Sequence, residues 1–227
     1  MKLSKQHIAT FLVVLFHLSG AIGILYTPYK DWFIRNTPIN LCLMAALLVW
    51  NQREKNVYFF LFFMLAFITG MATEMIGVHT GWLFGEYQYG QVLGPKINAV
   101  PWLIGLNWFV VVFCSGSVML QMQAWFKRKL EKQDFPMTTG ITALSLVIDG
   151  AMVAVFFDWI MEPVAMKLGF WQWQNSEVPF YNYLCWFVIS ALLLLAYRLF
   201  SFSKPNHFAV HLFIIQALFF LVLRTFL

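Results

Sequence analysis

The sequence predicts an all-α integral membrane protein with about seven transmembrane helices in a single domain over residues 1–227. Its 227 residues are 61% hydrophobic and only 11% charged, whereas soluble domains average about 25% charged residues. The apolar residues also form runs close to the roughly 20 residues that a spanning helix needs. We expect helices at about 7–26, 37–50, 57–77, 100–121, 138–161, 182–200 and 207–226.

The first two segments need separate arguments. The segment 7–26 follows Lys2 and Lys5, which is also how a signal peptide begins. No convincing small-residue cleavage site follows it, so we expect a retained helix. The segment 37–50 is short for a spanning helix, and its helix could begin nearer Trp32.

The basic residues predict the orientation in the membrane. Ten of the 15 lysines and arginines fall on the amino-terminal side of a seven-helix topology, and five fall on the other side. Because positive residues concentrate in cytoplasmic loops, we expect a cytoplasmic amino terminus and an external carboxyl terminus. The net charge of +5 therefore does not indicate nucleic-acid binding. The ten residues are Lys2, Lys5, Arg53, Lys55, Lys127, Arg128, Lys129, Lys132, Arg198 and Lys204.

Two long aromatic loops on the outer side resemble each other. In each, a glutamate precedes a glycine by seven residues, an aromatic-Gln-aromatic triplet follows, and a proline then precedes a tryptophan by seven. The pattern favours a parallel duplication of helices three–four and five–six, with a site where the repeats meet. Coincidence is the alternative, because these residue types are common in membrane loops. The residues are Glu74, Gly81, 87–89, Pro101 and Trp108, then Glu162, Gly169, 171–173, Pro179 and Trp186.

Four carboxylates lie within or near the ends of predicted helices: Glu74, Asp149, Asp158 and Glu162. Carboxylates in a bilayer are costly and face a bundle interior or a water-filled cavity. Asp158 and Glu162 are four residues apart, so they share one helical face. Their mutual repulsion and poor hydration favour the protonated form of at least one, which could then act as a general acid. The alternative is a structural pair that is hydrogen-bonded to helix ends or water.

Asp149 differs from the other three acids in its position on the helix. It precedes Asp158 by nine residues, which turns it to roughly the opposite side of an unbroken helix. Either the helix is distorted near Gly150 or Asp149 makes a separate polar contact.

Aromatic residues share segments with the acids. Tryptophan and tyrosine also collect at membrane interfaces, which is a sufficient explanation for Trp32 but a weaker one for the rings beside the acids. Because ring faces stabilise cations, an acid that protonates an apolar molecule beside such rings would be a coherent chemical set. The rings are Trp82, Tyr87, Tyr89, Trp171 and Trp173.

Other chemistries find no support in the sequence. The five histidines and three cysteines form no metal-ligand or disulfide spacing. No lysine lies in the seventh predicted helix, so a retinal Schiff base there is excluded. Neither a phosphate-binding glycine loop nor an aspartate-rich diphosphate motif is present.

The motif residues resemble the carotenoid 1,2-hydratase family of the CruF type, which includes bisanhydrobacterioruberin and γ-carotene hydratases. The likeness covers about residues 70–190. It runs through "E-x2-G-x2-T-G-x2-F-G-x-Y-x-Y" from Glu74, "D-x3-E-P-x-A" from Asp158, "G-x-W-x-W" from Gly169 and "P-x2-N-x3-W" from Pro179. The predicted helices outside this region are compatible with the family but add no specific likeness. The middle helices are richer in phenylalanine than is usual in the family.

The resemblance implies addition of water, without a cofactor or metal, across the terminal C1=C2 bond of a linear (ψ) carotenoid end group. Lycopene, γ-carotene or a bacterioruberin precursor would enter from the bilayer of a prokaryotic cytoplasmic membrane, where other carotenoid-pathway enzymes are expected partners. Asp158 would donate the proton, Glu162 would tune it or hold the water, and Glu74 would be a base or alternative acid. Substrate contacts are expected from Trp82, Tyr87, Tyr89, Trp171, Trp173, Asn182 and Trp186, with polar support from Asp149, His79, Thr80 and Glu86.

Two other functions stay open. A membrane lycopene cyclase also protonates a carotenoid end group, but an internal double bond then captures the cation and the product gains no water. A non-enzymatic carotenoid- or lipid-binding protein, or a transporter, would tolerate Asn and Gln in place of the three acids.

Overall fold

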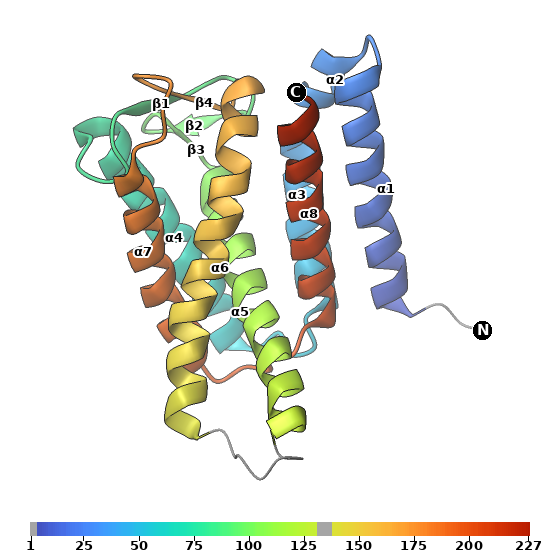
Figure 1. Ribbon diagram of the computed structural model, residues 1–227, viewed down its shortest axis with the longest axis vertical. Coiled ribbons are helices and arrows are strands. Elements are labelled where there is room, and N and C mark those ends of the chain that lie inside the picture. The colour runs from blue at the N-terminus through green and yellow to red at the C-terminus, as the bar shows by residue number, and fades with distance from the viewer. Residues whose placement is uncertain (1–3, 131–137) are drawn as a thin grey trace.

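The computed structural model, described here for residues 4–130 and 138–227, is a helical bundle with a small sheet region at one end (Figure 1). All seven predicted apolar segments are helical. Six of the described helices are long and apolar enough to cross a membrane: α1, α4, α5, α6, α7 and α8. Their bounds are Lys5–Tyr26, Val57–Thr80, Leu103–Leu130, Thr139–Lys167, Phe180–Leu199 and His207–Phe226.

Two shorter helices complete the bundle. The predicted short segment forms α3, Thr37–Asn51, with 15 residues. Trp32 belongs instead to α2, Lys30–Arg35, a separate helix of 6 residues. The start of α1 and the end of α8 lie at opposite ends of the bundle (Figure 1). Which end faces the cytoplasm stays a prediction, and Lys2 and Lys132 of that argument lie outside the described residues.

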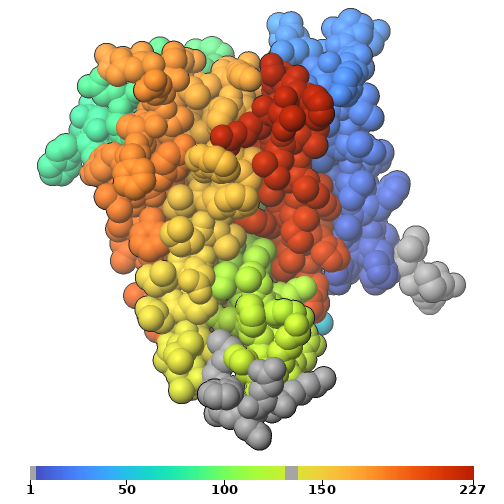
Figure 2. All heavy atoms as spheres, viewed as in Figure 1, coloured from blue at the N-terminus to red at the C-terminus, as the bar shows by residue number. Residues whose placement is uncertain are grey.

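Helix α5 is the central helix of the bundle. It packs against α3, α4, α6, α7 and α8, and every residue from Leu103 to Ser117 except Asn107 is buried. Helix α1 lies at the periphery, where it packs against α2, α3 and α8. Side chains of α8 fill the space between α6 and α1 on the face shown in Figure 2. The bundle therefore has two sides. One consists of α4 to α7, and the other consists of α1 to α3 together with α8, which pack against α5 and α6 of the first.

Helix α6 continues past its predicted end at residue 161 to Lys167, with Pro163 inside it. Proline has no N–H, so the carbonyl of the residue four positions earlier loses its helical partner. That residue is Trp159, and its carbonyl accepts a 2.9 Å hydrogen bond from Nη1 of Arg224 in α8. The carbonyl is thereby satisfied from a neighbouring helix, and the extra turn carries Glu162 within regular helix.

The two long aromatic loops fold back over the helix ends. Strand β1, Tyr87–Tyr89, pairs antiparallel with β4, Trp171–Trp173, and Gln88 lies opposite Gln172. Backbone bonds from Gly90 to Phe170 and from Gln174 to Glu86 extend the pairing at both ends. A second pair, β2 (Lys96–Ile97) with β3 (Val100–Pro101), forms a tight hairpin beside it. We call the β1–β4 pair the ribbon.

Candidate active site

Glu74 is buried near the end of α4 and accepts three hydrogen bonds. The hydroxyls of Tyr87 and Tyr89 donate to Oε2 at 2.5 and 2.6 Å, and the indole Nε1 of Trp108 donates to Oε1 at 3.0 Å. Gly77 permits this approach, because a Cβ there would lie 3.0 Å from the Tyr87 hydroxyl and 2.9 Å from Phe84. Gly81 then ends the helix with a φ of 64°, a left-handed conformation that favours glycine and turns the chain towards the ribbon.

Glu162 is the corresponding acid of α6. Its Oε2 accepts hydrogen bonds from the indole nitrogens of Trp171 at 2.9 Å and Trp173 at 2.8 Å. Each strand of the ribbon therefore supplies two donors to the glutamate of the helix that precedes it. The triplets predicted to share a site with the acids do reach them.

Asp158 lies one turn before Glu162 and is 1% exposed. Its Oδ2 accepts a 2.8 Å hydrogen bond from Nδ2 of Asn182 in α7. Its Oδ1 is buried and has no hydrogen-bond partner among the described residues. A buried polar atom without a partner is costly, so it indicates a place for a proton, a water or a ligand group.

Stacked and tilted rings enclose the acids. Trp108 and Trp186 stack with their ring centroids 3.8 Å apart and their planes 10° apart. Across the ribbon, Tyr87 lies 4.9 Å from Trp173 and Tyr89 lies 5.9 Å from Trp171. These rings exclude bulk water from the carboxyl groups and present π faces, which attract cations.

The two ribbon tyrosines remain donors over a wide pH range. Burial, and next the nearby Glu74 carboxyl, raise the pKa of Tyr87 and of Tyr89 well above the usual range for tyrosine. Both hydroxyls therefore stay protonated and keep their protons available to Oε2 of Glu74.

A small cavity of about 20 Å³ lies among these groups. A cavity needs roughly 10–15 Å³ of such volume to hold one water molecule, so this one has room for a single water. All three predicted acids line it. The other lining residues are Phe84, Tyr87, Tyr89, Ile104, Asn107, Trp108, Met161, Trp171, Trp173, Asn182 and Trp186.

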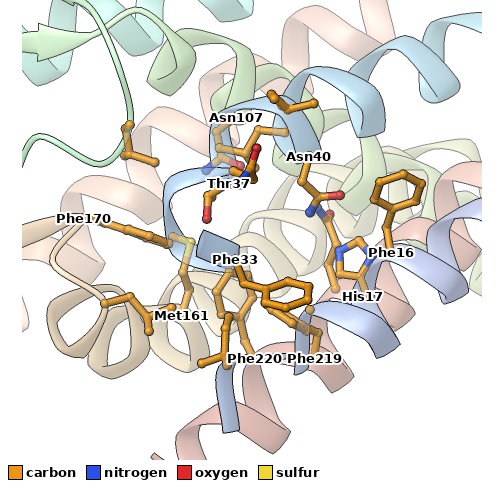
Figure 3. Close-up of a pocket in the computed structure, with 18 of the residues that line it drawn as sticks. Phe16, His17, Phe33, Thr37, Asn40, Asn107, Met161, Phe170, Phe219 and Phe220 are labelled. Atoms are coloured by element: carbon orange, nitrogen blue, oxygen red, sulfur yellow. The ribbon is translucent and has the colours of Figure 1, made fainter. Parts of the chain in front are cut away.

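A larger cavity of about 460 Å³ adjoins the small one. It lies between α1, α2, α3 and α8 on one side and α5 and α6 on the other. In Figure 3, Met161 and Phe170 lie across the cavity from Phe16 and His17. The residues that line both cavities are Ile104, Asn107, Met161 and Trp171.

The structure does not bring every predicted residue to this site. Trp82 is 79% exposed and lies outside both cavities, because the left-handed turn at Gly81 directs the chain outward. His79 and Glu86 are also exposed. Thr80 has a local role, since its hydroxyl donates to the Ile76 carbonyl at 2.6 Å and accepts from the Trp82 N–H. The sequence places these four residues in the site, whereas in the structure they lie at the surface beside it.

Asp149 has a separate polar contact. Helix α6 is continuous through Gly150, and Asp149 is exposed on the side away from Asp158. The hydroxyl of Ser145 donates to its Oδ2 at 2.6 Å. Of the two readings left open by the sequence, the separate contact is the one observed.

The sequence arguments missed several residues of the site. Trp108 was part of the motif, but its spacing gave no sign that its indole would donate to Glu74. Asn107 lines both cavities, and its side chain makes no hydrogen bond with any described residue. The contribution of α1 and α8, including His17 and Gln216, could not be found because these helices carry no motif.

Comparisons with known proteins agree with the resemblance seen in the motifs. A family model described as "Carotenoid biosynthesis protein" matches residues 37–227. Over 137 residues the chain is 27% identical to a bisanhydrobacterioruberin hydratase of Haloarcula japonica. This match covers 59% of the chain and 42% of that relative, so the chain spans less than half of the relative's length. No solved structure matches the chain.

Proposed function

The chain belongs to the carotenoid biosynthesis protein family, and from this premise we propose that it adds water to the terminal C1=C2 double bond of a linear carotenoid end group. The observation that carries the proposal is the enclosed carboxyl cluster, in which Oδ1 of Asp158 has no partner among the described residues. Hydration of an alkene needs a proton donor, a site that stabilises a cation and one water. The cluster offers carboxyl groups as proton donors, aromatic rings beside a cation and a cavity for one water.

Hydrogen bonding distinguishes the three acids. Three donors face Glu74 and two face Glu162, whereas Asp158 has one. A carboxylate only accepts hydrogen bonds, while a protonated carboxyl group also donates one. The donors thus suit Glu74 and Glu162 as carboxylates. Asp158 is the acid whose free oxygen can carry the proton to be transferred.

The reaction would proceed in two steps. The electron pair of the C1=C2 bond takes the proton of Asp158 at C2, which leaves a tertiary cation at C1 and the Asp158 carboxylate. The oxygen of the water then bonds to C1, and one of its protons passes to Glu162. Glu162 returns that proton to Asp158 one turn away, so each turnover consumes one water and restores both acids.

The rings and Glu74 would stabilise the cation. The stacked Trp108 and Trp186 line the small cavity together with Trp171, and an indole face stabilises a desolvated cation by about 2 kcal/mol. Glu74 adds a negative charge that its three donors hold in place. Asn182 would keep Asp158 in position through its 2.8 Å hydrogen bond.

The size and polarity of the small cavity favour water capture over cyclisation. Its volume of about 20 Å³ suits one water, and three carboxyl groups border it. A cyclase would need that space for a second part of the substrate and would have to keep water out. A transporter would need polar groups along a path, whereas the acids of this cluster lie together near one end of α4 and α6.

Three further proposals concern the setting of the reaction. The six long apolar helices support a multi-pass membrane protein, and we propose that it lies in a prokaryotic cytoplasmic membrane, where it meets its carotenoid. Residues 1–227 would form a single domain. We also propose that α4–α5 and α6–α7 arose by duplication. The register of Gln88 opposite Gln172 and the stacking of Trp108 on Trp186 support this, because a two-fold axis would produce both.

Expression of the chain in a lycopene-producing bacterium tests the proposed reaction. We expect carotenoids with the mass of lycopene plus one or two waters, and none from the Asp158→Asn variant. A new product with the unchanged mass of lycopene would instead identify a cyclase. Unaltered lycopene, with the protein present in the membrane, would contradict the proposal for this substrate.

A further inference from the structure

The larger cavity reaches the surface of the bundle among exposed side chains. Trp32 of α2 and Ile39 of α3 line it and are 60% and 64% exposed, and Phe16 of α1 joins them at 41%. In a membrane, such exposed apolar side chains on helices face lipid. The mouth of the cavity between α1 and α3 is therefore open to a molecule dissolved in the bilayer.

The inner end of this cavity borders the acids. Ile104, Asn107, Met161 and Trp171 form a wall common to both cavities. A chain that entered at the mouth would bring its terminal atoms to this wall, while the remainder of a long molecule stayed in the lipid. These four side chains lie between the larger cavity and the small cavity of the carboxyl cluster.

The shape of the larger cavity, rather than its polarity, would determine which apolar ligand binds in it. Six phenylalanines line the larger cavity, all but Phe157 labelled in Figure 3: Phe16, Phe33, Phe157, Phe170, Phe219 and Phe220. Lipid tails are as apolar as these rings, so a ligand that leaves lipid gains little from the hydrophobic effect and depends on packing contacts. The free volume of the cavity then decides which chain binds.

Gly20 of α1 lies where this volume can be changed. It lines the cavity, and a Cβ there would lie 3.5 Å from the Phe219 ring, an ordinary contact. At Gly23, one turn further along α1, a Cβ would lie 2.1 Å from Phe33, so that glycine is required for packing. A Cβ at position 20 is therefore tolerated, and we expect a larger side chain there to take up part of the cavity that Gly20 lines.

We propose that the larger cavity binds one end of a linear isoprenoid chain that enters sideways from the lipid between α1 and α3, and that Gly20 sets the space for that end. The proposal rests on the proposed function for the reaction at the acids. The recognised part is the branched end with its isolated double bond, and the distant part of the chain makes no contact with the protein.

A size series at position 20 tests the assignment. We expect Gly20→Ala to bind lycopene nearly as the wild type does, and Gly20→Phe to bind it about tenfold or more weakly, the scale expected when a packed space is overfilled. Binding is measured by quenching of tryptophan fluorescence in nanodiscs. Leu18→Phe is the matched control, because Leu18 lies on the same helix, is 58% exposed and does not line the cavity. Equal binding by Gly20→Phe and Leu18→Phe would overturn the proposal.

A second variant and a competitor guard against misfolding of Gly20→Phe. Ile39→Trp narrows the mouth from an exposed position, and we expect it to slow lycopene uptake severalfold without loss of folded protein. Squalene has the same branched end without the conjugated chain, so we expect it to compete with lycopene. Normal uptake by Ile39→Trp, or no competition by squalene, would refute one-ended binding.

The binding measurements also separate this proposal from the proposed reaction. Lycopene binding that depends on position 20, without any hydrated product, would support the cavity and refute the hydration. Hydrated product from wild type and Gly20→Phe alike would support the reaction and refute the cavity as its entrance.

Discussion

The two helix–loop–helix units that meet at the ribbon hold their glutamates differently. In α4–α5, two phenol hydroxyls and one indole bind Glu74, whereas in α6–α7 two indoles bind Glu162. One turn before its glutamate, the second unit has Asp158 and the first has Gly70. A Cβ at Gly70 would lie 2.6 Å from Trp108, so no side chain fits there.

The proposed reaction gives the two units different tasks. The first unit uses the space beside its glutamate for an indole that fixes the carboxyl group. The second leaves this space to another acid with one donor. A fixed carboxylate suits electrostatic stabilisation, and an acid with a free oxygen suits proton transfer.

Asp158→Asn should have the largest effect. The amide can still accept from Asn182 but cannot donate a proton to carbon, so we expect hydrated product to fall about 10²- to 10⁴-fold. Product is measured by mass spectrometry of membrane pigments. Asp149→Asn on the outer side of α6 is the matched control and should retain full activity. Equal losses in both variants would exclude a special role for Asp158.

Glu162→Gln should lower hydration about 10²-fold, because the amide cannot take the proton of the water. The fold should persist, since the amide oxygen can face both indoles, Trp171 and Trp173. Initial rates in isolated membranes, beside the amount of folded protein, separate the two effects. Full activity in this variant would move proton acceptance to another group.

Glu74→Gln should affect stability more than Glu162→Gln does. Donors face both oxygens of Glu74, so one would meet an amide N–H, and we expect a loss of about 1–3 kcal/mol. The loss is read from the apparent unfolding temperature in detergent. Equal temperatures for Glu74→Gln and Glu162→Gln would remove the contrast between the units.

High pH should weaken the first unit. The raised pKa of Tyr87 and Tyr89 means that their contribution is complete below about pH 10, the ordinary tyrosine value. Above it the unfolded chain loses these protons first, so stability falls by up to about 1.4 kcal/mol per pH unit for each tyrosine. The unfolding temperature between about pH 8 and 11 should fall more steeply for the wild type than for a Tyr87→Phe/Tyr89→Phe variant. Parallel curves would contradict the assignment.

Trp82→Ala should have the smallest effect, within about 0.5 kcal/mol in stability and without loss of hydration, as is usual for exposed positions. Trp173→Ala in the ribbon is the comparison, and there we expect a clear loss. A strong loss of product in Trp82→Ala would return this residue to the site.

Local sequence patterns predicted the helices and most of the acid cluster. Apolar runs locate helices because bilayer thickness determines their length, and the i, i+4 spacing placed Asp158 and Glu162 on one face. The triplets reached their glutamates because each pair lies within one short segment. Trp82 lies in the same segment, but it follows the left-handed turn at Gly81, which directs it away from the acids.

Contacts between distant segments could not be read from the sequence. The extension of α6 beyond Pro163 depends on Arg224, which lies in another helix. The larger cavity depends on how α1 and α8 lie against α5 and α6, and those helices show only apolar runs. A hydrophobic pattern states that a face is buried, but not against which partner.

The ribbon also constrains when the site can form during synthesis. Its strands are separated by 81 residues, 90–170, which lie between the paired Tyr89 and Trp171. Two helices, α5 and α6, lie between the two strands, so both must be synthesised before β4 can pair with β1. Until then Glu74 has its own tyrosines, Tyr87 and Tyr89, whereas Glu162 lacks both of its indole donors, Trp171 and Trp173. The acid cluster is therefore completed late in the synthesis of the chain.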